Sequence, residues 1–351
     1  MKLFSPHTLG IDISDRSIEA LELKTSGKEL TLVASSRQEL PEGIVEDGII
    51  NDQSGLSKYL TAIMEQARPK SFTSRTVAFS LPESRTMQHL FFFPQKFTPK
   101  QIREALPFEA EKVIPFETDN SPWDFQILGT EGTRVAVNYA VAPRKLIDQY
   151  VEVFQSVRLK PVICELESQA LVRSLTYQYT AGSISALLDI GARTTDVIMR
   201  DEFGVRFTLS IPVAGNHFTK AIAEHLNISL GDAESKKIKS GFTLKEIRTA
   251  VAPLCKLIID GADKATTFIE QKTKKKILEL VLCGGSALLP GITEYFQERI
   301  DCPVRIGDPW KGISVKKPPE PSLLYSTVIG LAMRGAREAK THSINFLSPY
   351  I

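Results

Sequence analysis

Residues 186–201 read ALLDIGARTTDVIMRD, and this stretch decides the fold prediction for the chain. An apolar run ends at Asp189, Gly191 permits a tight bend, and a second β-rich run follows. Thr194 and Thr195 carry hydroxyl groups and backbone amides around the bend. Such a turn can offer N–H groups to a phosphate and a carboxylate to its metal ion. Taken alone, Asp-x-Gly between two strands is usually a plain hairpin, so the motif needs support from elsewhere.

Two other stretches supply that support. Residues 9–23, LGIDISDRSIEALEL, repeat the strand–turn–strand pattern, with Asp12 at the end of the first strand. Residues 280–291, LVLCGGSALLPG, predict a strand that ends at Gly284 and Gly285 before a helix. These glycines would let the backbone approach a flat ligand, or a phosphate at a helix N-terminus. Two acidic turns that lie about half a chain apart indicate an internal duplication.

Composition and charge restrict the class of protein. A chain of 351 residues with 42% hydrophobic and 24% charged residues is long enough for several cores and typical of a soluble globular protein. The formal net charge of +2 gives no general attraction to nucleic acid. The sequence has neither an apolar run of about 18 residues nor an apolar signal core, which predicts a cytoplasmic protein. The four cysteines are far apart and lack C-x-x-C spacing, so we expect reduced residues.

Residues 83–160 differ in their order of predicted elements from the sequence on either side. A strand stops at Pro94, Thr98 would cap a helix over residues 101–113, and Pro107 would kink that helix. A hairpin and a second helix follow. This β-α-β-β-α order predicts a small α+β subdomain inserted between the two repeats.

The second half contains two further helical patterns. Glu234 and Lys237 lie one helical turn apart, which taken alone favours a solvated ion pair. A long helix is predicted from about Pro253, in its first turn, to Lys274. The last helix is predicted over residues 322–339.

The order of the three turns resembles the two phosphate loops and the adenosine loop of the superfamily that contains actin, the heat-shock chaperone ATPases and the sugar kinases. Within it the chain resembles the type IV pilus assembly family PilM over nearly its whole length. The resemblance is carried by LGIDIS at 9–14, EDGIINDQ at 46–53, REALPFEAEKVIPF at 103–116, YAVAPRKLIDQYVEVF at 139–154, DIGARTTDVIMRDEFGVRFTLSIPVAGN at 189–216, AESKK at 233–237 and CGGSALLPGI at 283–292. The helix-Pro-Phe signature of the inserted subdomain, at residues 103–116, is the most specific part of the resemblance, because generic actin-fold ATPases lack it. FtsA-like division proteins share the position of the inserted subdomain but not these residues.

This resemblance implies an α/β, actin-like (ribonuclease H-like) fold with two duplicated lobes around a nucleotide cleft and an inserted α+β subdomain. The implied parts are a first lobe of residues 1–82 and 161–185, a partner-binding subdomain of residues 83–160, a second lobe of residues 186–340 with a helical subdomain at 228–276, and a tail of residues 341–351.

The resemblance also implies ATP and Mg²⁺ as ligands. Asp12 and Asp189 would face the metal and the phosphates, and Glu234 and Lys237 would meet the ribose and base. The implied nucleotide-binding residues are Asp12, Ser14, Ser17, Asp189, Gly191, Ala192, Thr194, Thr195, Gly215, Glu234, Lys237, Gly284, Gly285 and Ser286. Two acidic turns from opposed lobes suit a hard cation that bridges phosphates.

A partner is implied as well. The inserted subdomain would hold the N-terminal cytoplasmic peptide of the membrane protein PilN, so the chain would reach the inner membrane only through partners. An extended peptide could pair its main chain with the subdomain and place alternate side chains in pockets. The candidate pocket residues are Leu106, Phe108, Val113 and Phe116, with core packing as the alternative for at least half of them.

The chain departs from the family pattern at the first turn. Ser14 stands where the family commonly has glycine, and Asp15 adds negative charge beside the expected phosphate. Arg193 in the second turn could offset part of that charge. Because no residue is recognisable as the general base that activates water, the expected activity is at most that of a slow ATPase.

Three function classes therefore remain. The favoured one is a nucleotide-regulated adaptor in the inner-membrane platform of a type IV pilus, or of a related type II secretion or competence system. The second is an FtsA-like filament-forming division or segregation ATPase, which would usually end in an amphipathic membrane helix. The third is a small-molecule kinase, which requires a catalytic Asp in a substrate cleft.

The final segment, SINFLSPY at residues 343–350, looks like the short apolar Asn-Leu-Leu-Pro-type segment with which PilN proteins begin. Ile344, Phe346 and Leu347 offer apolar anchors, and Asn345 can form hydrogen bonds. We predict that this tail can occupy the partner groove of its own chain or of a neighbour, with self-association through residues 344–347 in the second case. A disordered end, or a tail packed on its own lobe, is the alternative.

Overall fold

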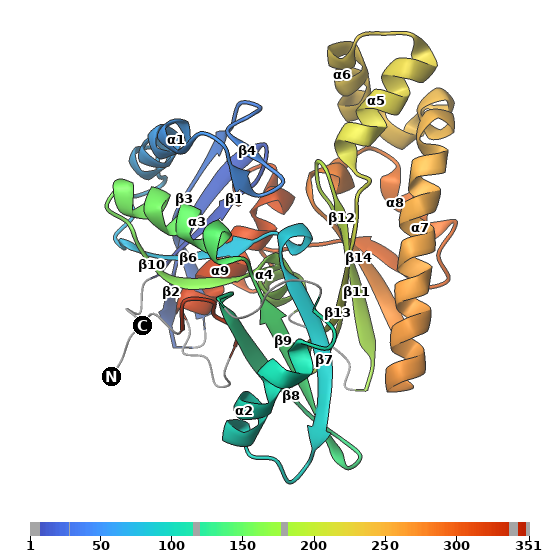
Figure 1. Ribbon diagram of the computed structural model, residues 1–351. Coiled ribbons are helices and arrows are strands. Elements are labelled where there is room, and N and C mark those ends of the chain that lie inside the picture. The colour runs from blue at the N-terminus through green and yellow to red at the C-terminus, as the bar shows by residue number, and fades with distance from the viewer. Residues whose placement is uncertain (1–7, 28, 115–119, 177–181, 337–342, 349–351) are drawn as a thin grey trace. The chain divides into compact units, whose positions relative to one another are not determined.

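The computed structural model describes residues 8–27, 29–114, 120–176, 182–336 and 343–348. The chain forms two compact units (Figure 1). Unit 1 consists of Met1–Ser174, Trp310–Pro319 and Thr327–Ile351, and unit 2 of Leu175–Pro309 and Glu320–Ser326. Residues 327–336, which the sequence interpretation grouped with the second lobe, thus belong to unit 1. The boundaries of the inserted subdomain and of the tail stay predictions.

Unit 1 is built on a mixed sheet. Its strands, in spatial order, are β10 (Lys160–Leu166), β6 (Thr76–Leu81), β1 (Leu9–Ile13), β2 (Ser17–Ser26), β3 (Glu29–Glu39) and β16 (Ile313–Ser314). The β1–β2 and β2–β3 pairs are antiparallel, and the β1–β6 and β6–β10 pairs are parallel. Strand β10 therefore ends the sheet, and only one of its edges is paired with another strand.

Helices cover both faces of this sheet. Leu9 and Ile11 belong to the same buried cluster as α1 (Gln53–Glu65) and α3 (Arg144–Ser156). Gly10 points the opposite way because side chains alternate along a strand, and it faces α9 (Ser326–Ala336). A Cβ at Gly10 would lie 2.6 Å from the carbonyl oxygen of Val328, so only glycine allows this close packing.

Local sequence signals explain α1. The side chain of Asp52 accepts a hydrogen bond from the Gly55 amide at 2.8 Å and caps the first turn. Leu56, Leu60 and Ile63 follow at helical spacing and are fully buried. The remaining short elements of unit 1 are β4 (Val45–Glu46), β5 (Ile49–Ile50), the 3₁₀ turn η1 (Glu83–Arg85) and α4 (Glu167–Leu175).

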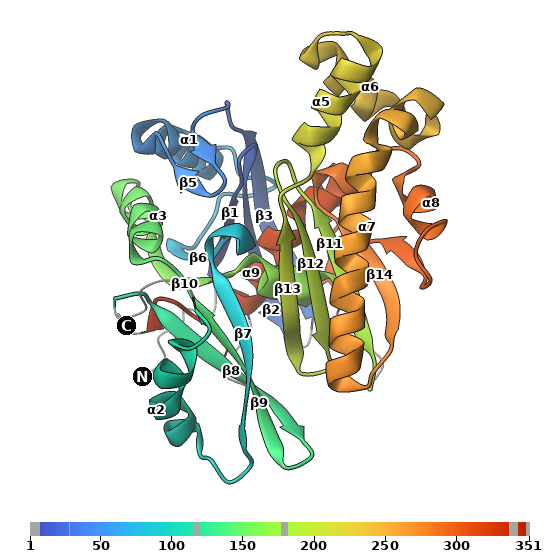
Figure 2. The ribbon, with the colours of Figure 1, turned by 45° about the vertical axis from the view of Figure 1, so that its right-hand side comes forward.

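The inserted segment forms a three-stranded antiparallel sheet with a helix on one face (Figure 2). The strands lie in the order β7 (Met87–Pro94), β9 (Arg134–Val141), β8 (Trp123–Glu131), and the helix is α2 (Pro99–Ala110). Thr98 forms a capping box with Gln101, which confirms the predicted cap. Pro107 lies inside the helix, as predicted, and the helix ends at Ala110 rather than at residue 113.

Unit 2 repeats the topology of unit 1. Its strands, in spatial order, are β13 (Gly204–Ile211), β12 (Thr195–Asp201), β11 (Ile184–Ile190), β14 (Ile277–Cys283) and β15 (Val304–Ile306). The first two pairs are antiparallel and the last two are parallel, as in the series β3, β2, β1, β6, β10. The predicted duplication is thereby confirmed, with β1–β2 and β11–β12 as equivalent hairpins.

The helices of unit 2 correct one prediction. They are α5 (Gly215–Leu226), α6 (Leu230–Ser240), α7 (Lys245–Thr273) and α8 (Ile292–Gln297), with 3₁₀ turns η2 (Gly241–Thr243), η3 (Gly285–Leu288) and η4 (Ser322–Tyr325). The predicted start of the long helix near Pro253 is wrong, because α7 begins at Lys245. An interior proline costs about 3 kcal/mol, but the buried stripe continues on both sides of it through Ile247, Val251 and Cys255.

The last helix is also shorter than predicted. Residues 322–325 form η4, α9 covers Ser326–Ala336, and residues 337–339 lie outside the described residues. Among the described residues, none of the helices is both long and apolar enough to cross a membrane.

Candidate functional site

The first predicted turn joins β1 to β2 in unit 1. Asp12 lies opposite Glu19 in the register of the hairpin. The Ser14 amide donates to the Ser17 carbonyl at 2.9 Å and closes the turn. The Ser14 Oγ accepts from the amides of Ser17 at 3.1 Å and Arg16 at 3.4 Å. The hydroxyl that replaces the family's glycine therefore engages N–H groups that a phosphate loop would present to its ligand.

Glu19 lies opposite Asp12, and the sequence interpretation did not include it among the site residues. Burial and then the charge of Asp12 raise its pKa to about 8, although Arg37 Nε donates to it at 2.9 Å and acts in the opposite direction. The sequence signal that could have revealed Glu19 was the predicted antiparallel hairpin, because its register places Glu19 opposite Asp12.

The second predicted turn joins β11 to β12 in unit 2. The Gly191 amide donates to the Thr194 carbonyl at 3.0 Å. Two bonds tie this turn to the start of α5, from the Gly215 amide to the Gly191 carbonyl at 3.1 Å and from the Asn216 amide to the Ala192 carbonyl at 2.8 Å. These bonds hold the turn against the N-terminus of α5 and engage the first two amides of that helix.

A second acidic residue, Asp196, lies beside Asp189 in this hairpin. The two residues are opposite each other in the hairpin register, and one carboxylate oxygen of each lies within 4.8 Å of the other. Cys283 is the neighbour of Asp189 on β14, and burial followed by the two carboxylates raises the pKa of its thiol. The thiol is therefore protonated, and carboxylate oxygens are the ligands on offer, as a hard divalent cation requires.

Two predicted glycines permit this crowding. Gly284 has φ +82°, and a Cβ there would overlap the Asp189 Oδ1. A Cβ at Gly215 would lie 2.6 Å from the Ser286 Oγ, which itself donates to the Gly191 carbonyl at 3.1 Å. The predicted strand–Gly–Gly turn and the predicted acidic turn thus meet, and the glycines allow Asp189 and Ser286 to pack directly against the backbone.

Lys237 and Glu234 form more than a solvated ion pair. Lys237 is buried, its Nζ lies 2.8 Å from the Glu234 Oε2, and it also donates to the Gly215 carbonyl at 3.0 Å and to the Thr219 Oγ1 at 2.8 Å. The pair therefore belongs to the same cluster as Gly215. Thr219 was not predicted, and only the packing of α5 against α6 reveals it.

The unit 2 cluster, as we call it, consists of Asp189, Gly191, Asp196, Gly215, Glu234, Lys237, Gly284 and Ser286. Thr195 is buried beside it, and its hydroxyl donates to the Val213 carbonyl at 2.6 Å, so this hydroxyl has a structural partner. Asp12, Ser14 and Ser17 lie in unit 1. The roles of all these residues toward a ligand stay predictions.

The predicted partner residues differ in their surroundings. Leu106 is fully buried in the core between α2 and its sheet. Phe108 and Val113 are exposed, at 68% and 41% of their surface, and Phe116 lies outside the described residues. Phe108 and Val113 are therefore the described members of the set that a partner can reach, and Phe108 is the more exposed of the two.

Comparison with known proteins gives a family and a fold. A protein-family model described as type IV pilus assembly protein PilM matches residues 10–336. A solved PilM–PilN type IV pilus biogenesis complex covers 94% of this chain and 99% of that chain, with a TM-score of 0.79 and 22% identity. MreB5 of Spiroplasma citri bound to AMPPNP covers 93% of this chain and 95% of that chain, with a TM-score of 0.52 and 15% identity. The fold is thus actin-like, as predicted.

Among curated proteins, cell division protein FtsA of Pseudomonas aeruginosa is 29% identical over 180 residues, which make up 43% of this chain and 42% of that protein. FtsA of Buchnera aphidicola is 23% identical over 368 residues, 88% of this chain and 87% of that protein. The chain therefore spans well under two thirds of the first relative's length.

Proposed function

Since the chain belongs to the type IV pilus assembly PilM family, we propose that it is an ATP-binding, actin-like adaptor of the inner-membrane assembly platform of a type IV pilus or of a related secretion or competence system. In this proposal Mg²⁺ accompanies the nucleotide. The adaptor holds the N-terminal cytoplasmic peptide of a PilN-like membrane protein and reaches the membrane through it.

The unit 2 cluster is the observation that carries the nucleotide part. The turn of residues 191–194 is hydrogen-bonded to the start of α5, and in this proposal the backbone at its tip, residues 192–194, meets the phosphates. Asp189 and Asp196 are the carboxylates that would hold Mg²⁺, which neutralises phosphate charge when bound. We extend the proposal to Asp12, which the family resemblance assigns to the metal and phosphates.

Turnover is proposed to be slow at most. The Ser14 hydroxyl accepts bonds from amides of the first turn, so fewer donors there are free to stabilise charge that develops on a transferred phosphoryl group. In this proposal the nucleotide acts by occupancy, and the adaptor responds to ATP rather than to rapid hydrolysis.

Binding of a fluorescent ATP analogue to the Asp189→Asn variant tests the nucleotide part. Loss of one carboxylate charge should weaken binding in the presence of Mg²⁺ at least about tenfold, or about 1.4 kcal/mol. Binding in EDTA should be weak for the parent and the variant alike. The matched control is Asp260→Asn, an exposed acid of α7 paired with Lys256. Equal affinity of the parent and Asp189→Asn would contradict the proposed site.

Capture of a PilN-like N-terminal peptide, with and without ATP, tests the partner part. A charge introduced by Phe108→Asp should leave the fold intact because that side chain is exposed, and it should reduce capture if the peptide lies on α2. Leu257→Asp is the matched control, since Leu257 is an exposed apolar residue of α7. No capture by the parent chain and none by a chain that lacks residues 343–351 would together reject the adaptor function.

The FtsA-like filament is the second candidate, and the similarity to two FtsA proteins favours it. The filament function predicts that the chain polymerises and sediments when ATP is added, whereas the adaptor function does not require polymerisation. Sedimentation with ATP and without captured peptide would favour the filament.

A further inference from the structure

The tail segment, as we call residues 343–348, is part of the core of unit 1. Ile344 and Phe346 are fully buried, and Leu347 is nearly so. All three belong to the cluster formed by the central sheet and helices α1 and α3. A disordered end is therefore wrong for these residues. The core of α2 is a separate apolar cluster.

Asn345 docks the tail segment on the free edge of β10. Its side-chain Oδ1 accepts from the Cys164 amide at 2.9 Å, and its Nδ2 donates to the Val162 carbonyl at 3.1 Å. The Phe346 amide adds a bond to the Cys164 carbonyl at 2.9 Å. One side-chain amide thus replaces a peptide group of a neighbouring strand. Aspartate in its place has no donor for Val162.

Charged groups hold the main chain of the tail segment from the other sides. Asp124, a buried residue of β8 in the inserted subdomain, accepts from the Asn345 amide at 3.0 Å. Arg334 of α9 donates to the carbonyls of Ile344 at 2.6 Å and Ser343 at 3.0 Å. The tail segment therefore lies in a groove, here named the tail groove, bounded by β10, β8 and α9.

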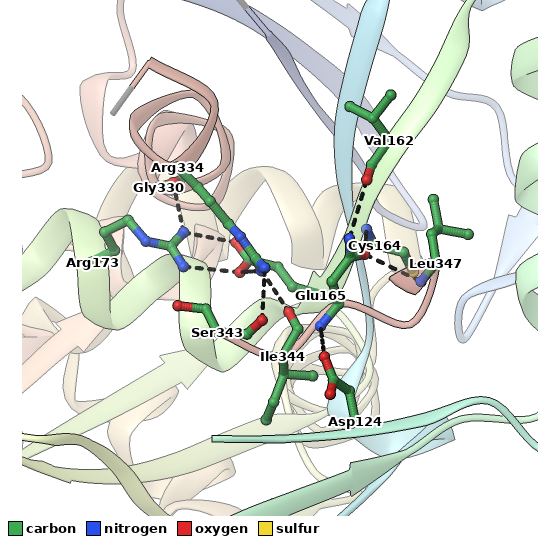
Figure 3. A network of polar contacts seen from close by, with 11 residues as sticks. Asp124, Val162, Cys164, Glu165, Arg173, Gly330, Arg334, Ser343, Ile344 and Leu347 are labelled. Carbon is green, nitrogen blue, oxygen red and sulfur yellow. Dashed lines mark hydrogen bonds and ion pairs between the residues drawn. The ribbon is translucent and has the colours of Figure 1, made fainter. Parts of the chain in front are cut away.

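The charged groups beside the tail groove are paired with one another. Glu165 of β10 pairs with Arg334, and Arg173 of α4 donates to both Glu165 oxygens at 2.7 and 2.8 Å and to the Gly330 carbonyl at 2.7 Å (Figure 3). Arg334 and Asp124 contact the tail segment at its backbone atoms, and such contacts accept any extended peptide with suitable side chains.

We propose that the tail segment is a detachable internal ligand, and that it competes for the tail groove with an extended partner segment of the pattern apolar–Asn–apolar–apolar. The occupant must be apolar at the positions of Ile344, Phe346 and Leu347, and it must have asparagine between the first two. Without an occupant, the groove would expose that apolar core to water, which is unfavourable. This proposal rests on the proposed function, in that the partner segment belongs to the captured peptide.

The connection makes the tail a strong competitor. Residues 337–342 join α9 to the tail segment, and a short tether gives an effective concentration on the order of millimolar. A tail that fills the groove in about nine molecules of ten lowers the apparent affinity of a competing peptide about tenfold. Access of the partner would then depend on release of the tail.

The test uses a fluorescently labelled peptide with the sequence of residues 343–348, SINFLS, titrated into the full chain and into a chain that lacks residues 343–351. The truncated chain should bind the peptide at least about tenfold more tightly. The same peptide with Asn345→Ala should bind neither. If the truncated chain fails to fold by circular dichroism, the full-length Asn345→Ala variant, whose own tail is weakened, replaces it and should also bind SINFLS more tightly than the parent.

The outcomes separate this proposal from the proposed function. Equal affinities of the parent, truncated and Asn345→Ala chains for SINFLS would overturn it, as would binding by none of them. Dimers of the full chain that the truncation abolishes would also overturn it, because the tail would then occupy a second copy. Tight SINFLS binding that a PilN-like peptide fails to displace would instead support the tail groove and contradict the proposed partner.

Discussion

Glu165→Gln is expected to destabilise unit 1 strongly. Glu165 is fully buried and accepts charge-assisted hydrogen bonds from Arg173 and Arg334. Glutamine removes the negative charge and directs an N–H group at one guanidinium, so two cations remain with a neutral partner. Breaking a buried ion pair in this way costs about 3–5 kcal/mol. Because Arg173 is 23% exposed and water can solvate part of its charge, we expect a loss of about 3 kcal/mol.

Urea unfolding followed by tryptophan fluorescence measures this loss. The chain has two tryptophans, Trp123 and Trp310, and both belong to unit 1, so the signal reports that unit. A loss of about 3 kcal/mol corresponds to a fall of about 6–12 °C in the unfolding temperature of a unit of this size. The matched control is Glu109→Gln, which breaks the exposed pair between Glu109 of α2 and Lys112 and should change stability by less than about 1 kcal/mol. Equal losses for the two variants would refute the reasoning.

Three further predictions follow from particular contacts. Acid should destabilise the parent through Glu165. Burial raises the pKa of this carboxyl, but the two arginines outweigh burial and hold the pKa below 4.5. The stability that the ionised carboxylate contributes above that value is therefore lost as pH falls through the folded pKa, and the urea midpoint of Glu165→Gln should depend less on pH below about 4.5. Gly284→Ala should weaken binding of the ATP analogue because its Cβ would displace Asp189, whereas Gly182→Ala, at φ +81° in open space, carries the backbone strain alone and should bind normally. Thr98→Ala should cost about 1 kcal/mol in the tryptophan-detected unfolding of unit 1, because it removes the capping box of α2; an unchanged midpoint would show that the cap is dispensable.

Local patterns in the sequence were sufficient for many of the elements and for the duplication. The acidic turns at Asp12 and Asp189 each follow a buried strand, and alternation of side chains together with a tight turn specifies a hairpin wherever it occurs. The cap at Thr98 is also local, because the residues that satisfy its hydrogen bonds lie within one turn. These signals depend on neighbours in the chain, so the sequence by itself determined them.

Packing between distant segments decided the rest. The sequence favoured a solvated Glu234–Lys237 pair, but α5 packs on α6 and buries Lys237 against Gly215. The start of α7 was misplaced because the cost of Pro253 is local, whereas the burial that offsets it is tertiary.

The tail segment shows the same division most clearly. Its apolar anchors and its asparagine could be recognised in the sequence, but its position on β10 could not. The hydrogen bond from Asn345 to Val162 joins residues 183 positions apart. No periodicity or capping rule relates two such positions. They meet because β10 ends its sheet with an unpaired edge, and because α9 places Arg334 beside that edge.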